Sequence, residues 1–271
     1  MNAPAPATDF ALSPLHAAVQ RVRRCFDAAV LNEIVNHPAV LPHVGGTGQE
    51  LDLGPVVQDI TNVALYDDGI AGIFNCLAPG IYELHSMAVP ERRGKPVMSV
   101  AAACFHIMFT RTSAIEIITR VPHGNLRALV AAKAAGFRLE FETSGGWITP
   151  EGPKPVAWYR LSLQDWASRA PGLIERGRWF HAAVDAAAAR AGVERDHHPD
   201  DDTHNRYAGM ACEMILGGMM PKGIHFLNRY NAITRARPVQ VLSHNPLVVH
   251  IGDIALGIDL ATETIEIVKA Q

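Results

Sequence analysis

One stretch, residues 81–137, constrains the fold of this chain most, because its strand and helix signals follow one another without a gap. Residues 81–89 alternate well enough to predict a strand, which Pro90 ends. Residues 91–95 form a short basic turn. Residues 96–111 have apolar side chains at helical spacing, and the proline that opens them suits the first turn of a helix.

A second strand and a second helix complete the stretch. Residues 114–121 predict the strand, and Asn125 opens a helix that ends at Gly136. The basic turn therefore faces the start of a helix, where unpaired N–H groups and the positive end of the helix dipole attract anions. The order of elements predicts an anion-binding turn.

This stretch resembles the GNAT superfamily, the acyl-CoA-dependent N-acetyltransferases. The likeness rests on residues 88–95 (AVPERRGK), 125–128 (NLRA) and 135–137 (AGF). It covers roughly residues 20–165 and implies an α/β (α+β) fold. We expect a mixed, mainly antiparallel sheet with helices on both faces, in which the strand 81–89 splays from its neighbour.

The resemblance also implies that acetyl-CoA is the cofactor. The residues that it assigns to acetyl-CoA are Met87, Val89, Arg92, Arg93, Gly94, Lys95, Val97, Asn125 and Arg127. The basic side chains of the turn would reach phosphate as charges or bidentate donors, or else form a solvated basic turn. Asn125 is also a good helix N-cap, a role that needs no ligand.

Two side chains of the first strand are candidates for catalysis. Glu83 and His85 lie two residues apart, so they share one face of the strand. If they lie on the face of the groove, either can deprotonate an amine, directly or through water. If they lie on the other face, they are solvated strand residues.

Three positions depart from the GNAT pattern. With the turn aligned on Arg93, Pro96 and Met98 occupy its two small positions. Pro96 has no N–H to donate to a phosphate, and Met98 places a bulky side chain where the backbone should approach closely. Ala132 stands where the family often carries a tyrosine that acts as general acid. These departures predict a degenerate acetyl-CoA loop.

Composition narrows the class of partner. The net charge of −3 argues against nucleic acid and against an anionic membrane surface, and no apolar run approaches the roughly 18 residues of a membrane span. The first residues lack the pattern of a signal peptide. The four cysteines are scattered, which is typical of reduced thiols. We expect a cytoplasmic protein, or a virion protein if a phage encodes it.

Changes in composition divide the chain into three parts. Residues 1–13 are rich in Ala and Pro and predict a flexible arm. We expect the GNAT-like domain to span residues 14–166 and a smaller α+β domain to span residues 171–271. Within the second part, residues 14–35 predict one or two helical turns and then a helix with Phe26 on its apolar side.

Two further segments can be interpreted from their residue types. Asp68-Gly69 between apolar runs predicts a hairpin. The polar run 196–204 contains His and Asp, which could ligate a metal, but it equally fits a solvated loop, so we expect no metal site.

Two functions remain open at this point. One is a non-catalytic assembly protein of a bacteriophage virion, a head–tail or tail component. The other is an active N-acetyltransferase that moves an acetyl group from acetyl-CoA to a primary amine. The chain resembles GNAT-like proteins encoded among bacteriophage structural genes, and the matching segments are residues 36–38, 82–85, 93–94, 121–122 and 161–166.

The C-terminal part favours the assembly role. Its apolar helices carry Met and aromatic side chains, namely Met210, Met214, Met219, Met220, Phe226 and Tyr230, some of which a domain of this size needs for its own core. The remainder, with Arg229, Arg235 and Arg237 nearby, has the character of an interface centre. We therefore expect other protein chains as partners, either further copies of this chain or virion proteins.

Overall fold

The chain divides into two compact units. The units are residues 1–106 with 114–162, and residues 107–113 with 163–271. The computed structural model describes residues 14–44, 48–170, 172–193, 201–232, 239–251 and 254–268. The arm expected at residues 1–13 lies outside these described residues, and the expected boundaries 14–166 and 171–271 stay a prediction.

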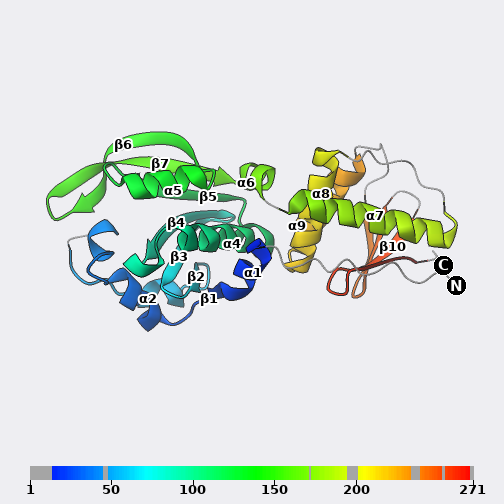
Figure 1. The fold of residues 1–271 in the computed structure, drawn as a ribbon, viewed down its shortest axis with the longest axis horizontal. Coiled ribbons are helices and arrows are strands. Elements are labelled where there is room, and N and C mark those ends of the chain that lie inside the picture. The colour runs from blue at the N-terminus through cyan, green and yellow to red at the C-terminus, as the bar shows by residue number, and fades with distance from the viewer. Residues whose placement is uncertain are drawn as a thin grey trace. The chain divides into compact units, whose positions relative to one another are not determined.

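The first unit is built on a seven-stranded sheet in the order β1-β2-β3-β4-β5-β7-β6 (Figure 1). Its strands are β1 (Arg23–Arg24), β2 (Val63–Asp67), β3 (Ile70–Ala78), β4 (Ile81–Ala88), β5 (Glu116–Pro122), β6 (Arg138–Thr149) and β7 (Gly152–Ser162). Neighbouring strands are antiparallel except β4 and β5, which run parallel. The expected mixed, mainly antiparallel sheet is therefore confirmed.

Helices cover the sheet of the first unit on both faces. The helical segments are α1 (Pro14–Arg21), α2 (Ala28–Val35), η1 (Leu41–His43), α3 (Gly54–Gln58), η2 (Pro90–Arg92), α4 (Lys95–Arg111), whose residues from 107 on belong to the second unit, and α5 (Leu126–Ala134). On one face, Leu31 and Ile34 of α2 pack with Ala71, Ile73 and Met87 of the sheet, and α3 joins this cluster. Figure 1 draws α4 along β3 and β4, and α5 along β5 and β7.

The turn between β2 and β3 brings the end of β4 into place. Asp68 and Gly69 both have positive φ, 42° and 76°, as a type I′ hairpin requires, so the expected hairpin is present. A Cβ on Gly69 would lie 2.9 Å from Val89 Cγ2, so only glycine fits there. The Val89 N–H donates to the Gly69 carbonyl oxygen at 3.1 Å, which anchors the start of the basic turn.

One expectation for the N-terminal helices is wrong. Phe26 lies between α1 and α2 and is 67% exposed, with the Arg24 guanidinium 5.0 Å from its ring centre. The cause is the short strand β1, which pairs Arg23 and Arg24 with β2 and takes the chain out of helical conformation. Asp27 then caps α2 by accepting from the Ala29 N–H.

Within its described residues, the second unit combines four helices and the end of α4 with a small antiparallel sheet in the order β11-β10-β9-β8. Its elements are α6 (Leu163–Arg169), α7 (Leu173–Ala191), α8 (Asp202–Leu216), α9 (Met220–Ala232), β8 (Gln240–His244), β9 (Leu247–Ile251), β10 (Ile254–Asp259) and β11 (Thr264–Ile267). Phe180, Leu227, Tyr230, Val249 and Leu256 form the centre of its core. The expected second, smaller α+β part is confirmed.

Glycines bring α7 and α8 unusually close. A Cβ on Gly177 would lie 1.7 Å from the Asn205 carbonyl oxygen, and one on Gly209 would lie 1.9 Å from that of Leu173. Both distances are far below any real contact, so neither position can carry a side chain without moving a helix. Of the methionines expected to serve either the core or an interface, Met210 and Met214 are buried at 3% and 0% exposed.

Candidate functional site

The candidate site lies where β4 and β5 separate. The two strands pair over only three residues, from Ile81 opposite Glu116 to Glu83 opposite Ile118. Both strands continue past this point, β4 to Ala88 and β5 to Pro122, but they no longer pair with each other. This is the splay that the resemblance implied, and it leaves main-chain groups of β4 available to a ligand.

Alternation along β4 decides which main-chain groups face the splay. The Leu84 carbonyl oxygen accepts from Thr119 Oγ1 of β5 at 3.0 Å, so Leu84 directs its main chain toward β5. Every second residue of a strand repeats that direction, so Ser86 and Ala88 do the same.

Met87 and Val89, which the sequence analysis assigned to the cofactor, do not direct their main chains toward β5. Val89 directs its N–H to Gly69 instead, and Met87 pairs with Ala71 of β3. The Met87 side chain is buried among α2 and α3 at 6% exposed. Their assignment to acetyl-CoA stays a prediction, and the geometry favours the main chain of Ser86 and the N–H of Ala88, whose carbonyl oxygen accepts from Arg93.

Glu83 and His85 lie on one face of β4 and form a cluster with Arg120 of β5. His85 Nε2 lies 3.6 Å from Glu83 Oε1, which also accepts a hydrogen bond from Arg120 Nε. The Glu83 side chain is 9% exposed, whereas the His85 side chain is 33% exposed. The expectation from strand alternation holds for these two residues, and Arg120 is a member that the sequence analysis missed.

The environment of Glu83 makes it a poor proton acceptor. Burial raises the pKa of Glu83, but the hydrogen bonds and charges of His85 and Arg120 outweigh burial and lower it below its ordinary value. A carboxylate with a lowered pKa holds a proton weakly at neutral pH. Of the two candidates, His85 is therefore the better general base, with Glu83 positioned to orient its ring.

Aromatic rings continue this cluster across the sheet. The Arg120 guanidinium lies 5.2 Å from the centre of the Trp158 ring, and Phe141 stacks on Trp158 at 5.4 Å between ring centres. Trp158 Nε1 is buried and has no hydrogen-bond partner within the described part of the chain. Trp158 was also missed by the sequence analysis, although its pairing with Arg120 follows once β5 and β7 are known to be neighbours.

The arginines of the basic turn are bonded to the protein itself. Arg92 Nε donates to the Asp68 carbonyl oxygen at 3.0 Å, and its Nη2 lies 3.2 Å from Asp68 Oδ2. Arg93 Nε donates to the Ala88 carbonyl oxygen at 3.3 Å, and Arg93 Nη2 to that of Ala39 at 2.7 Å. Both guanidinium groups brace the turn, which leaves fewer of their N–H groups for a phosphate.

The first turn of α4 offers few donors. Gly94 has a φ of +89°, which favours glycine, and Lys95 is exposed. The Met98 N–H bonds to the Gly94 carbonyl oxygen at 3.4 Å, and Pro96 has no N–H. The amides that a helix start leaves unpaired are thereby reduced to those of Lys95 and Val97.

The start of α5 is occupied by a cap. Asn125 Oδ1 accepts from the Ala128 N–H at 3.2 Å, so this side chain is used as the N-cap that its sequence position allowed. Arg127 is exposed on the same first turn. Ala132 is buried and carries no proton to donate, so the family's tyrosine acid has no counterpart at this position.

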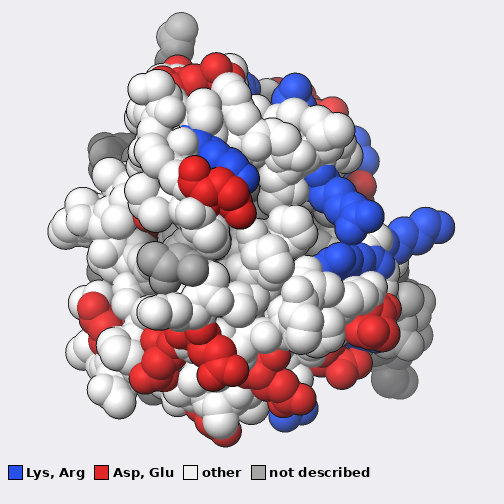
Figure 2. Space-filling view, turned by 90° about the vertical axis from the view of Figure 1, so that its left-hand side faces the viewer, with Lys and Arg blue, Asp and Glu red and all other residues white. Residues whose placement is uncertain are grey.

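Charged side chains of both signs lie on the face that Figure 2 draws. Figure 2 shows Lys and Arg side chains gathered at one side of the drawn face and Asp and Glu side chains mainly along its lower edge. Among the residues that the structure describes, no three His, Cys, Asp or Glu side chains are grouped to hold a metal ion. His197 and His198 of the polar run lie outside those residues, whereas His204 is fully buried in α8. No described helix is long and apolar enough to cross a membrane.

No protein-family model matches this chain, and no curated protein sequence matches it either. Solved acetyltransferase structures are similar to part of it. Spermidine N-acetyltransferase from Vibrio cholerae, in complex with CoA and spermine, is 12% identical with a TM-score of 0.47, and the match covers 54% of this chain and 98% of that one.

Two further solved structures match a similar share of the chain. Ribosomal-protein-S5-alanine acetyltransferase from Vibrio fischeri is 12% identical with a TM-score of 0.44, covering 54% of this chain and 93% of that one. Ribosomal-protein-alanine N-acetyltransferase from Brucella melitensis is 12% identical with a TM-score of 0.43, and the match covers 52% of this chain and 98% of that one. The chain is thus similar in part to several acetyltransferase structures, at low identity.

Proposed function

We propose that this protein is a GNAT-like assembly protein of a bacteriophage virion, a head–tail or tail component, that does not transfer acetyl groups. The observation that carries the proposal is the anchoring of Arg92 and Arg93. Both bond to main-chain oxygens of the protein, and Arg92 also pairs with Asp68. A turn that holds its own arginines in place has fewer guanidinium N–H groups left for the pyrophosphate of acetyl-CoA.

Two other features support the loss of transfer chemistry. Pro96 removes one amide from the start of α4, and Ala132 supplies no acid for a leaving thiolate. Each charge-assisted hydrogen bond to phosphate is worth roughly 1.5–3 kcal/mol, so its loss weakens binding roughly tenfold or more. The assembly role itself is supported by the resemblance to GNAT-like proteins encoded among phage structural genes. Its partners would be virion proteins or further copies of this chain.

A second candidate function rests on the pair His85 and Glu83. The pair lies beside the unpaired edge of β4, and His85 is placed to accept a proton from an amine, with Glu83 3.6 Å away to stabilise the resulting positive charge. This arrangement favours an N-acetyltransferase that moves an acetyl group from acetyl-CoA to a primary amine.

Titration of the purified full chain with acetyl-CoA by calorimetry distinguishes the two functions. We expect no binding, or a dissociation constant weaker than about 100 μM, because the turn has few free donors. A micromolar or tighter constant would overturn the assembly proposal. In that case His85→Asn should abolish most acetyl transfer to an amine while leaving acetyl-CoA binding unchanged.

A further inference from the structure

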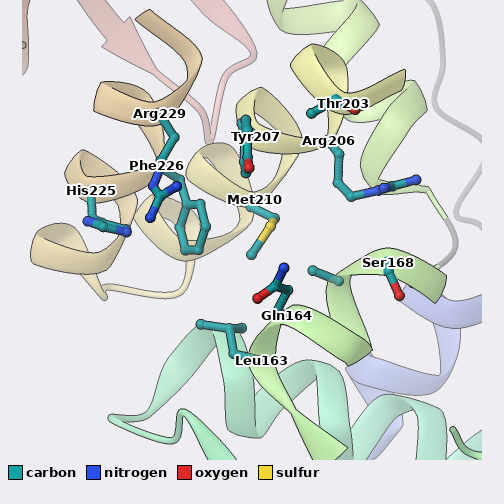
Figure 3. A pocket seen from close by; sticks show the side chains of 11 residues that line it. Leu163, Gln164, Ser168, Thr203, Arg206, Tyr207, Met210, His225, Phe226 and Arg229 are labelled. Atoms are coloured by element: carbon teal, nitrogen blue, oxygen red, sulfur yellow. The ribbon is translucent and has the colours of Figure 1, made fainter. Parts of the chain in front are cut away.

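A pocket of about 320 Å³ lies within the second unit, outside the candidate site (Figure 3). Three helices form it: α6 from one side and α8 and α9 from the other. Each helix contributes residues three or four positions apart, such as Thr203, Tyr207 and Met210 of α8, so one continuous stripe of each helix faces the pocket. The volume is at the lower end of the range for ligand sites.

The centre of the pocket is apolar and aromatic. Tyr207 and Phe226 stack with ring centres 6.2 Å apart and planes at 25°, and His225 meets the edge of Phe226 at 5.2 Å. Met210 is 3% exposed and lies between these rings and α6, and Figure 3 shows Gln164 of α6 pointing toward it. Aromatic and Met side chains around an apolar floor are typical of the centre of a protein interface.

Two arginines border this centre without a bonded partner. Neither Arg206 of α8 nor Arg229 of α9 makes a hydrogen bond or ion pair with any residue that the structure describes, and no Asp or Glu lines the pocket. Figure 3 shows the two side chains on opposite sides of Tyr207. Other arginines of this unit are paired: Arg176 with Glu213 and Glu263, for example.

We propose that this pocket binds an acidic peptide segment of a partner protein, with one apolar side chain seated on Met210 and Phe226 and a carboxylate on each side. Charge complementarity carries the proposal, because two unpaired guanidinium groups flank an apolar centre. Guanidinium groups bind carboxylates through two parallel hydrogen bonds. The inference rests on the proposed assembly function and names the chemistry of its partner.

A single small anion fits these observations less well. One phosphate or carboxylate is held best by donors that converge on it, whereas Arg206 and Arg229 extend from opposite sides of the aromatic pair. Two separated charges with an apolar group between them match a short stretch of chain. A phosphate-bearing ligand is therefore an outcome that the test has to distinguish.

The test uses the full chain and a fluorescein-labelled peptide with a Leu-Phe centre and two glutamates on each side. Fluorescence anisotropy at low salt should show saturable binding. The same peptide with glutamines in place of the glutamates should bind at least about tenfold more weakly. Arg206→Gln and Arg229→Gln should each weaken binding of the acidic peptide about tenfold, because the loss of one charge-assisted hydrogen bond lowers affinity by roughly that factor.

Arg169→Gln is the matched control, because it removes the same charge from α6 at an exposed position that does not line the pocket. It should bind the peptide like the natural chain. Absence of peptide binding, equal binding of the glutamine peptide, or equal loss in all three variants would overturn the proposal. If inorganic phosphate at the concentration of the peptide displaces the peptide completely, the pocket binds a small anion instead, and the proposal fails. Because none of these outcomes depends on acetyl-CoA, failure here is distinct from failure of the proposed function.

Discussion

The turn after β4 and the pocket of the second unit each carry two arginines, but the two pairs differ in whether they bond to the protein. Arg92 and Arg93 are bonded to oxygens of their own unit. Arg206 and Arg229 have no bonded partner within the described residues. A guanidinium that already donates to the protein has fewer of its five N–H groups left for a ligand and is held in place, whereas an unpaired one keeps them all. The site that the sequence marks for an anion is thus the less available of the two.

A buried arginine of the second unit tests the premise that bonded arginines are structural. Arg176 is 11% exposed and lies 3.2 Å from Glu213 Oε1 and 2.8 Å from Glu263 Oε1. Arg176→Ala leaves the buried Glu213 carboxylate without this partner, so we expect the free energy of unfolding to fall by about 3–5 kcal/mol. Urea unfolding followed by circular dichroism measures the change.

The control for Arg176 is Arg178→Ala, which removes an exposed pair with Asp202 at 3.4 Å. Surface pairs of this kind contribute about 1 kcal/mol or less. If Arg176→Ala costs no more than Arg178→Ala, bonding within the protein does not mark an arginine as structural, and the comparison loses its basis.

Arg93→Ala should have the next largest effect. It removes donors to the carbonyl oxygens of Ala39 and Ala88, so we expect a loss of about 1.5–3 kcal/mol in the free energy of unfolding. Lys95→Ala, at an exposed position two residues on, should stay within about 0.5 kcal/mol of the natural chain. Unchanged stability together with weaker acetyl-CoA binding would make the turn a cofactor site and reverse the comparison.

The pH dependence of stability tests the cluster around Glu83. Because the folded state lowers the pKa of Glu83 below its ordinary 4.5, the unfolded chain binds this proton more readily. The stabilisation is therefore present above pH 4.5 and is lost as the pH falls through the folded pKa. We expect the difference in stability between the natural chain and Glu83→Gln to shrink below pH 4.5.

Thermal unfolding at several pH values measures that difference. Glu91→Gln, which changes an exposed carboxylate outside the cluster, should follow the natural chain throughout. A Glu83→Gln curve parallel to that of the natural chain down to low pH would show that His85 and Arg120 do not stabilise the carboxylate.

The smallest effect is expected for the pocket. Arg206→Gln and Arg229→Gln remove no bond within the described residues, so each should change the free energy of unfolding by less than about 0.5 kcal/mol. Urea unfolding of both variants checks this. A loss comparable to that of Arg93→Ala would show that these arginines are structural as well, and the contrast between the two regions would disappear.

Much of the fold could be predicted from the sequence, because its signals are local. The hairpin at Asp68-Gly69 follows from the positive φ that a type I′ turn requires, and α5 begins after its N-cap Asn125. The period of the apolar residues predicted α4, which begins at Lys95. Alternation likewise placed Glu83 and His85 on one face of β4, since that relation involves only neighbours in the chain.

The state of each charge depends instead on contacts between distant segments. Arg120 bonds to Glu83 from 37 residues away, and Arg93 to Ala39 from 54. The direction of each main-chain group of β4, on which the choice of Ser86 and Ala88 over Met87 and Val89 rests, depends on which strands pair with it.

The residues that line the pocket come from α6, α8 and α9, and in the sequence they are spread from Leu163 to Arg229. A hydrogen bond requires its donor and acceptor within about 3 Å. Whether an arginine of this chain is bonded or unpaired is therefore decided by how strands and helices pack. Residue type and spacing leave that open.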